Sequence, residues 1–542
     1  MARNPQNIAH KILSSHLVGG LMVPGEEIQL KVDHLLMQDA LSALTMLALE
    51  AMELERIKIE LACQYVDHNL FQADFRNPDD HVFLRSCCQK FGIHYSAPGN
   101  GISHPTHQER FGVPGKLLVG TDSHTPAAGA IGMIGIGVGS IEGASILAGE
   151  PLNIPMPEIM GINLIGKLPD WVSAKDIILE ILRRHTVKGA VGRIIEYYGP
   201  GVATLSAMDR HVIANMGTEL GATSCVFPAD ARVREFLTET GRPDDYSELL
   251  ADDGCNYDYH DEINLSKLEP LIAKPSSPDN VVPVREVAGE PIYQSYIGSS
   301  ANPGFRDFAI TSMMVKGKRS APGVSFDVNP STRQVLTNIT ATGHLMSIIS
   351  SGARVHQTGC NGCNGMGQAP ASGTISLRTV PRNFPGRSGV ADDRVYLCSP
   401  ETATASALTG IITDPRDLGI PYPKVESPKD WIATIDIIEK PLSREEARNI
   451  KIQKGPNIAS LPLISPILNT IEAVVTLKMD DNVSTDTISP AGAKGLPYRS
   501  NVQKIAQFSF DALDKNYYSH SLSEVKKGNF HAIVAGQNYG QG

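Results

Sequence analysis

Glycine and proline interrupt the apolar runs of this 542-residue chain so often that few segments can form long helices or strands. The sequence contains 49 glycines and 36 prolines, and both residues break regular structure. Short strands and helices joined by many loops are typical of an α/β protein. Because one hydrophobic core cannot hold a chain of this length, about three or four domains are expected.

Two segments show the α/β pattern locally. Residues 173–184 (SAKDIILEILRR) predict a helix that begins after Ser173, with Asp176 in its first turn. Residues 116–126 (KLLVGTDSHTP) predict a strand through Val119 and then a polar loop. Binding sites in open α/β sheets gather at the carboxyl ends of strands, so this loop is a candidate site.

The charge balance and the cysteines limit the class of protein. A net charge of −10, from 48 basic and 58 acidic side chains, gives no support for nucleic-acid binding. The eight cysteines show no disulfide spacing, and the first residues lack the apolar core of a secretory signal, so a cytoplasmic protein is expected. The weakly polar run 126–149 contains several glycines and Glu142, which predicts a buried segment and not a membrane span.

A change of composition near residue 421 predicts a linker between domains. Residues 421–470 are rich in proline and charge and show little periodicity, as linkers do. Residues 470–492 then predict a new strand and polar loop, and residues 530–542 predict a strand with a glycine-rich turn. A strand and turn without a following helix indicate an incomplete last domain.

Residues 357–368 (QTGCNGCNGMGQ) predict a loop that holds Cys360 and Cys363 at C-x-x-C spacing, because glycine weakens helices and strands. Several interpretations of the thiols stay open on local grounds. A redox pair usually begins a helix, and a structural zinc needs a second pair of ligands. An iron–sulfur cluster held by three cysteines needs one more thiol. Two thiols without any ligand are the remaining alternative.

Three polar stretches place acid–base groups in loop contexts. They contain the pair Asp67–His68, the single His104, and the pair Asp122 and His124. A carboxylate beside a histidine fixes the ring tautomer and raises its basicity, which suits proton transfer. Taken singly, each stretch is more often a satisfied polar contact than a functional group.

An arginine pair adds a second kind of group. Arg382 and Arg387 flank a Pro-Gly turn in RNFPGR, a geometry that can clamp carboxylates through bidentate hydrogen bonds. A solvated surface turn would have the same sequence. Acid–base groups, arginines and thiols together favour a polycarboxylate substrate and removal of a proton next to a carboxylate.

The stretch VGTDSHTPAAGAIGMIGIGVG (119–139) resembles the aconitase family. The similarity covers essentially residues 1–542 and is greatest to single-chain aconitate hydratases of the shorter bacterial form. Further matching stretches are MQDA (37–40), VDHN (66–69), TVKGAVGRIIEYYGPGV (186–202), NMGTELGATSCVFP (215–228), SPDNVVPVREVAG (277–289), YLCSPETATASALTG (396–410) and GQNYGQG (536–542).

The resemblance implies an α/β fold with three α/β/α domains around an iron–sulfur site and a partial C-terminal swivel domain. The expected boundaries are residues 1–158, 159–280 and 281–420 for the three domains, 421–470 for the linker and 471–542 for the swivel domain.

The resemblance also assigns roles to individual residues. It gives Cys360, Cys363 and the position of Ser300 to a 4Fe–4S cluster, in which one iron acts as a Lewis acid on the substrate. The expected catalytic residues are Asp67, His68, His104, Asp122, His124, Glu262 and Asp486. The expected substrate contacts are Gln38, Ser123, Arg382, Arg387 and Arg499.

The chain departs from the family pattern at this expected site. Ser300, in IGSSAN (297–302), stands where the family has its first cluster cysteine. A serine hydroxyl is a harder and less acidic ligand than a thiolate. Pro381 stands in place of an asparagine, and Thr487 in place of a histidine. The family's Ser-Ser-Arg loop, which carries a catalytic base, would begin just after Gly542.

The resemblance implies a hydro-lyase that converts citrate to isocitrate through cis-aconitate. The alternatives are a related hydro-lyase for a homoaconitate-like or methylcitrate-like acid, and an inactive or truncated relative. A small tricarboxylate substrate is the expected partner. A monomer without nucleic-acid or membrane partners is expected.

Overall fold

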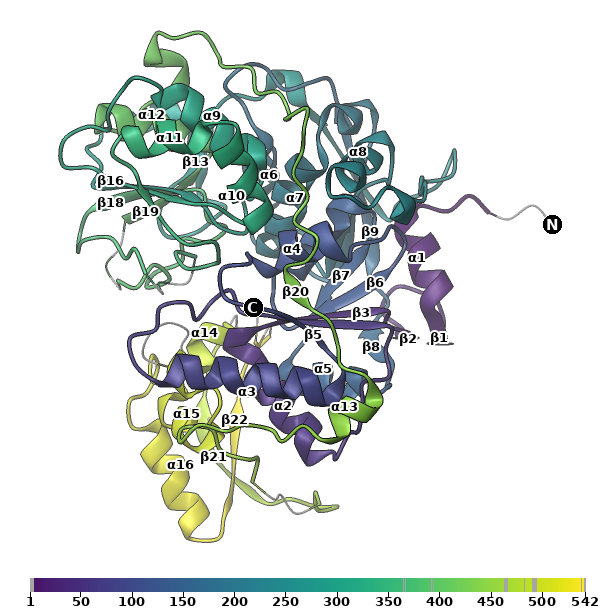
Figure 1. The fold of residues 1–542 in the computed structure, drawn as a ribbon. Coiled ribbons are helices and arrows are strands. Elements are labelled where there is room, and N and C mark those ends of the chain that lie inside the picture. The colour runs from purple at the N-terminus through teal and green to yellow at the C-terminus, as the bar shows by residue number, and fades with distance from the viewer. Residues whose placement is uncertain are drawn as a thin grey trace.

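Helices and parallel strands alternate along most of the chain in this computed structural model (Figure 1). The structure describes residues 4–540, apart from 364, 366, 391, 393, 463–465, 482, 490–494 and 538. Within these residues the strands form five sheets, of six, seven, four, three and two strands. The expected α/β multi-domain fold is confirmed.

A six-stranded sheet in the order β20-β5-β4-β3-β6-β7 carries the first group of site residues. Leu35 belongs to one buried apolar cluster together with Phe83, and its neighbour Leu36 belongs to another that contains Val233. The sheet is therefore buried on both faces, as is typical of parallel sheets. Its strands are β3 (His34–Gln38), β4 (Leu61–Tyr65), β5 (His94–Ser96), β6 (Leu117–Gly120), β7 (Ile134–Gly137) and the antiparallel β20 (Ile438–Glu439). Its helices are α2 (Asp39–Ala51), α3 (Arg76–Phe91), α4 (Ser103–Arg110) and α5 (Ser140–Leu147).

A four-stranded parallel sheet follows, in the order β11-β10-β9-β12. The predicted helix at 173–184 is confirmed as α6 (Ala174–His185), in which Ser173 and Asp176 form a capping box. The strands are β9 (Glu158–Ile165), β10 (Arg193–Tyr198), β11 (Ser224–Val226) and β12 (Tyr259–Asn264). Further helices of this part include α7 (Ala207–Asn215), the 3-10 helix η3 (Met216–Leu220) and α8 (Ala231–Glu239).

A seven-stranded sheet in the order β14-β13-β19-β18-β15-β16-β17 carries the second group of site residues. Its parallel strands are β15 (Gln294–Gly298), β16 (Ser325–Asn329), β17 (Arg354–Val355), β18 (Ile375–Arg378) and β19 (Arg394–Cys398). The antiparallel strands β13 (Leu271–Ala273) and β14 (Val281–Pro283) extend one edge. Helices α9 (Phe305–Val315), α10 (Arg333–Ala341), α11 (His344–Ser350) and α12 (Pro400–Thr409) cover it.

Residues 421–462 run along the outside of the molecule from the seven-stranded sheet toward the C-terminal lobe (Figure 1). Their regular structure is limited, within the described residues, to β20 and the short helix α13 (Arg444–Arg448). At the N-terminus, α1 (Ile8–His16) precedes a small antiparallel sheet of β1 (Leu17–Gly20), β2 (Glu27–Leu30) and β8 (Leu152–Pro155).

The glycine-rich run at 126–149 is mostly buried and folds into the 3-10 helix η1 (Thr125–Ile131), β7 and α5. A Cβ atom on Gly129 would lie 1.9 Å from the Cys225 carbonyl oxygen, so glycine allows this run to pack directly against β11. Among the described residues, no helix has both the length and the apolar composition that crossing a lipid bilayer requires.

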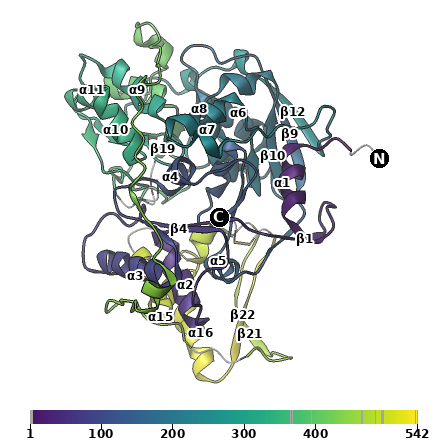
Figure 2. The same ribbon diagram turned by 45° about the vertical axis from the view of Figure 1, so that its right-hand side comes forward.

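The C-terminal segment forms a separate lobe beside α2 and α3 (Figures 1 and 2). Parallel strands β21 (Ala473–Lys478) and β22 (Phe530–Val534) make up its sheet, with helices α14 (Thr485–Ile488), α15 (Val502–Ile505) and α16 (Tyr517–Lys526). The sheet leaves apolar side chains in water: Val475 is 55% exposed and Phe530 is 50% exposed. Two strands with so little apolar burial contribute little independent stability.

We expect backbone amides of β21 and β22 to exchange with solvent about a hundredfold faster than those of β3 and β4, because local opening of a poorly buried sheet costs less free energy. Hydrogen–deuterium exchange with mass spectrometry measures this directly. Equal protection in the two sheets would contradict the exposure described for Val475 and Phe530.

Candidate active site

The polar residues singled out in the sequence gather at the carboxyl ends of parallel strands from two sheets. Asp67 follows β4 and Asp122 follows β6 in the six-stranded sheet, whereas Ser300 follows β15 and Arg382 follows β18 in the seven-stranded sheet. Strand ends of this kind are where α/β proteins bind ligands. The two groups approach each other closely enough for hydrogen bonds between the sheets.

Asp122 lies at the centre of a histidine cluster. Its Oδ1 lies 2.9 Å from His104 Nε2 and accepts the His124 backbone N–H at 2.8 Å. The His68 Nε2 lies 3.7 Å from Asp122 Oδ2. Burial by itself raises the pKa of Asp122, but the neighbouring His104 and His124 rings lower it well below its usual range. Asp122 is therefore an anion that can take part in proton transfer.

Glu219 joins the two sheets through a second cluster. Its Oε1 lies 3.0 Å from His124 Nε2 and accepts the Arg382 Nε–H at 2.7 Å. Arg382 also donates from Nη2 to the Ser123 hydroxyl at 3.0 Å. Burial opposes both charges, yet the pKa of His124 is raised by Glu219, and that of Glu219 is lowered by His124 and Arg382. One carboxylate thus holds two cations.

Asp67 and His68 form a pair that the backbone holds rigidly. His68 Nδ1 lies 2.8 Å from Asp67 Oδ1, and Asp67 Oδ2 accepts the Ser103 backbone N–H at 2.7 Å. The buried Asp39 carboxylate accepts the backbone N–H groups of Asp67, His68 and Asn69 at 3.1, 2.9 and 2.8 Å. The loop after β4 is therefore fixed from both sides.

Cys360 and Cys363 lie in a loop, as predicted, and both thiols are buried. Their sulfur atoms and a ring nitrogen of His68 all lie within 4.8 Å of one another. The interaction between the two thiols raises the pKa of Cys360 and, together with His68, lowers the pKa of Cys363 well below its usual value. The pair thus favours one thiolate at Cys363. Thiolate and imidazole side by side form a donor set for a soft metal.

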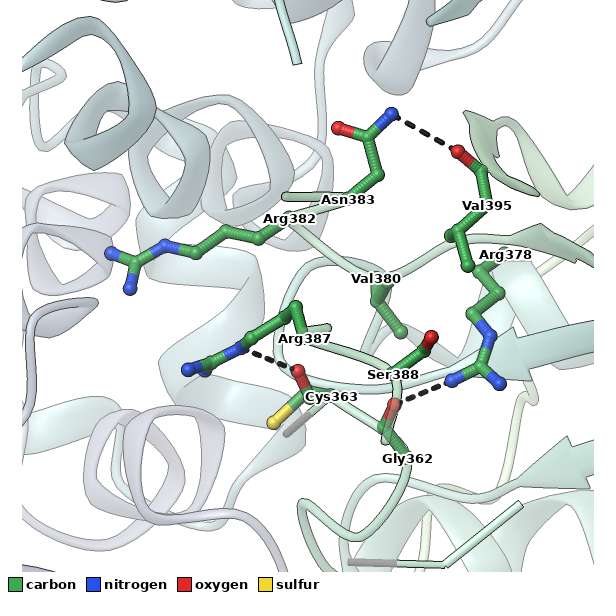
Figure 3. A pocket seen from close by; sticks show the side chains of 9 residues that line it. All are labelled: Gly362, Cys363, Arg378, Val380, Arg382, Asn383, Arg387, Ser388 and Val395. Carbon is green, nitrogen blue, oxygen red and sulfur yellow. Dashed lines mark hydrogen bonds between the residues drawn. The ribbon is translucent and has the colours of Figure 1, made fainter. Parts of the chain in front are cut away.

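Arg387 and Arg382 line a crevice next to this loop that is too narrow to admit a water molecule (Figure 3). In the figure the two guanidinium groups and the Cys363 sulfur point in the same direction. Arg387 donates from Nε to the Cys363 carbonyl at 2.9 Å. Arg378 lies on the opposite side of the crevice and donates to the Gly362 carbonyl at 2.8 Å. Arg387 and Arg378 thereby hold the cysteine loop against β18.

Three other predicted site residues make contacts outside the clusters around Asp122, Glu219 and the two cysteines. The buried Gln38 side chain caps α2 by accepting the Ala40 N–H at 2.7 Å. Ser300 is buried, and its carbonyl lies 2.9 Å from His211 Nε2. Glu262 is exposed on the edge strand β12, where its Oε2 accepts from Asn163 at 2.9 Å.

Two predicted residues belong to the C-terminal segment. Arg499 is half-buried and follows the 3-10 helix Leu496–Tyr498. The neighbouring Tyr498 ring lies under the Arg76 guanidinium, 4.9 Å away, so this part of the lobe touches α3. Asp486 falls in α14, but its side chain lies outside what the structure describes.

Glu219 and Asn215 were not singled out from the sequence, although both lie in the family-like stretch NMGTELGATSCVFP. Glu219 is the only acidic residue of that stretch, and this was the one feature of the sequence that could have indicated a role for it in the site. Asn215 is fully buried, and neither polar atom of its side chain has a hydrogen-bond partner among the described residues. It lies one helical turn after His211, which contacts Ser300.

Comparison with known proteins identifies the fold. A profile of the aconitase family (aconitate hydratase) matches residues 10–410. The chain belongs to the aconitase family. A 3-isopropylmalate dehydratase large subunit of Archaeoglobus fulgidus is 33% identical over 76% of this chain and 99% of that subunit. The mitochondrial aconitate hydratase of Gracilaria gracilis is 33% identical over 75% of this chain and 57% of its own length.

A third relative extends the match beyond the family profile. The mitochondrial homocitrate dehydratase of Saccharomyces cerevisiae is 28% identical over 99% of this chain and 78% of its own length. The family is therefore one of hydro-lyases whose members differ in substrate.

Replacing Glu219 with Gln is expected to lower the free energy of unfolding by about 3–5 kcal/mol, because it leaves two buried cations without their carboxylate. The stability that comes from pairing protonated His124 with Glu219 is fully present below the ordinary pKa of histidine. It is lost as the pH rises through the raised pKa of His124. Denaturant unfolding at several pH values measures both the loss and its decrease at alkaline pH.

Glu262→Gln is the matched control. Because Glu262 is exposed, this change is expected to shift the unfolding free energy by less than about 0.5 kcal/mol. Equal losses in the two variants would show that Glu219 does not carry the buried pairing.

Proposed function

We propose that this chain is a hydro-lyase that removes and adds water at a hydroxy-tricarboxylate of the citrate type, with an iron–sulfur cluster as its cofactor. The observation that carries the proposal is the meeting of the Asp122 histidine cluster with the Glu219–Arg382 pair. It places acid–base groups next to a carboxylate-binding cation. The narrower interpretation, a single-chain aconitate hydratase that interconverts citrate and isocitrate, is part of this proposal.

The residues fit an iron–sulfur cluster in the chemistry of their donor atoms. Cys360 and Cys363 would hold it. Both cysteines are free and buried, and thiolates are the ligands that iron–sulfur clusters take. The buried Oε2 of Glu219 has no hydrogen-bond partner among the described residues, which supports a polar occupant beside Arg382. When bound, such a cluster supplies a Lewis acid for the substrate hydroxyl.

The arginines bind the carboxylates of the substrate in this proposal. The Arg382 guanidinium is held at Nε by Glu219 and donates from Nη2 to Ser123. A substrate carboxylate in place of the Ser123 contact would gain a charge-assisted hydrogen bond. Arg387 is fixed at Nε to the Cys363 carbonyl, so that its orientation is set before substrate binds.

The histidines and Asp122 handle protons. His124 carries a proton because Glu219 raises its pKa, so it can act as a general acid toward a leaving hydroxyl group. Asp122, kept anionic by His104 and His124, lies 2.9 Å from His104 Nε2 through its Oδ1 and so fixes the orientation of that ring. Positioned groups of this kind typically contribute about 10²–10⁴ in rate.

Two observations bear on the substrate. The homocitrate dehydratase match includes the C-terminal lobe, because it covers 99% of this chain, whereas the isopropylmalate dehydratase large subunit matches 76%. This favours a tricarboxylate substrate. The near-complete coverage of that large subunit supports a second candidate, a dehydratase of an isopropylmalate-like dicarboxylate.

The proposal is tested with anaerobically reconstituted protein and three substrates: citrate, isocitrate and 3-isopropylmalate. Ultraviolet absorption follows formation of the new carbon–carbon double bond. We expect citrate and isocitrate to react at least about tenfold faster than 3-isopropylmalate. A preference for 3-isopropylmalate would replace the tricarboxylate proposal with the second candidate, and an iron-loaded protein that neither binds nor dehydrates any of the three would overturn both.

Arg382→Ala is expected to weaken citrate binding by about one to two orders of magnitude, because a charge-assisted hydrogen bond contributes about 1.5–3 kcal/mol. Isothermal titration calorimetry measures the dissociation constant. Arg394→Ala is the control, since Arg394 lies at the start of β19 in an exposed pair with Glu290. The same affinity in both variants would remove Arg382 from the substrate site.

A further inference from the structure

We propose that Lys175 is a positioning residue, which holds Arg382 in the orientation that binds a substrate carboxylate. This inference deepens the proposed function and rests on it, because it takes Arg382 to bind the substrate. Lys175 lies in the first turn of α6, and its side chain is fully buried. Its Nζ donates to the Thr379 carbonyl at 2.8 Å and to the Val380 carbonyl at 3.2 Å. These carbonyls stand directly before the turn that begins at Pro381 and Arg382.

The place of this lysine in the fold is an expensive one for a cation. The first turn of a helix lies at the positive end of the helix dipole, which disfavours a positive charge. Burial lowers the pKa of Lys175 to about 8, although Cys398, Glu219, Asp307 and Asp176 act in the opposite direction. Lys175 forms no ion pair with any residue that the structure describes, and Nζ bonds backbone carbonyls. Because an uncharged donor could link two chain segments at lower cost, the charge indicates a role in the site.

The two carbonyls belong to the point where the loops of the seven-stranded sheet begin. The Thr379 hydroxyl donates to the Gly298 carbonyl at 2.8 Å and accepts the Gly298 N–H at 2.9 Å. The Thr379 backbone N–H donates to the Tyr296 carbonyl at 3.1 Å. These bonds join the end of β18 to the end of β15, and Lys175 ties both to α6 in the neighbouring sheet.

Arg382 is thereby held from its backbone as well as from its guanidinium. Glu219 and Ser123 bond the guanidinium, whereas Lys175 fixes the chain just before it. Figure 3 shows Val380 between Arg382 and Arg378, in the wall of the crevice beside the cysteine loop. A shift of about 1 Å in a substrate-binding group can cost about a hundredfold in its effect. The two bonds from Nζ therefore determine where the Arg382 guanidinium meets a carboxylate.

A double-mutant cycle of Lys175→Met and Arg382→Ala tests this role. Anaerobically reconstituted protein is titrated calorimetrically with citrate, or with whichever of the three acids the unmodified protein binds. Methionine keeps most of the apolar length and removes both hydrogen bonds, so we expect Lys175→Met to weaken binding by about 10- to 100-fold. In the Arg382→Ala background, the same change should weaken binding by less than about threefold, because the group that Lys175 positions is already absent.

Lys424→Met is the matched control, because Lys424 lies in an exposed pair with Asp170. It should change the affinity by less than about twofold. Where Lys175→Met does not fold, as judged by circular dichroism, the same cycle is run with Lys175→Gln. The shorter, uncharged amide is expected to weaken binding by at least about threefold. If it does not fold either, a crystal structure of the unmodified protein with the acid bound decides.

Equal weakening by Lys175→Met in both backgrounds would show a general structural role and overturn the inference. Unchanged affinity in Lys175→Met, or a bound structure in which Nζ has left both carbonyls, would overturn it as well. Each of these outcomes leaves the hydro-lyase proposal standing. Unmodified protein that binds none of the three acids overturns the proposed function and, with it, this inference.

Discussion

A single buried carboxylate joins the parts of this molecule that form the site. Glu219 comes from the segment between β10 and β11, and it bonds His124 from the end of β6 and Arg382 from the end of β18. The neighbouring Thr218 hydroxyl donates to the Ser123 carbonyl at 2.8 Å. This is a second contact between the Glu219 segment and the loop after β6. A buried carboxylate is costly without cations, so this contact favours the arrangement in which three sheets meet.

The same contact sets the charge that the site offers to a substrate. Glu219 carries one negative charge against the two positive charges of His124 and Arg382, and Arg387 adds a further cation beside the thiols. Asp122 and the thiolate favoured at Cys363 balance these cations in net charge. In a buried site, where electrostatic interactions are stronger than in water, the two guanidinium groups still favour a ligand with carboxylates over a neutral one.

Local patterns predicted the parts of the fold that depend on neighbouring residues. The capping box of Ser173 and Asp176, the strand before Asp122 and the cysteine loop all appear as expected. The site could be predicted only in part, because Glu219 lies 95 residues from His124 and 163 from Arg382 along the chain. Composition gives no reason to prefer Glu219 over Glu262, and only the packing of sheets separates them.

The glycines around the two cysteines have a packing role as well as a conformational one. A Cβ atom on Gly362 would lie 2.4 Å from the Tyr296 ring, and one on Gly359 would lie 2.1 Å from Leu70. Gly359 also has a backbone φ of 153°, which residues other than glycine rarely adopt. The loop can therefore lie flat against β15 on one side and against the His68 loop on the other. Larger residues at either position would push the thiols away from the imidazole, so the glycine-rich sequence and the donor cluster are two aspects of one arrangement.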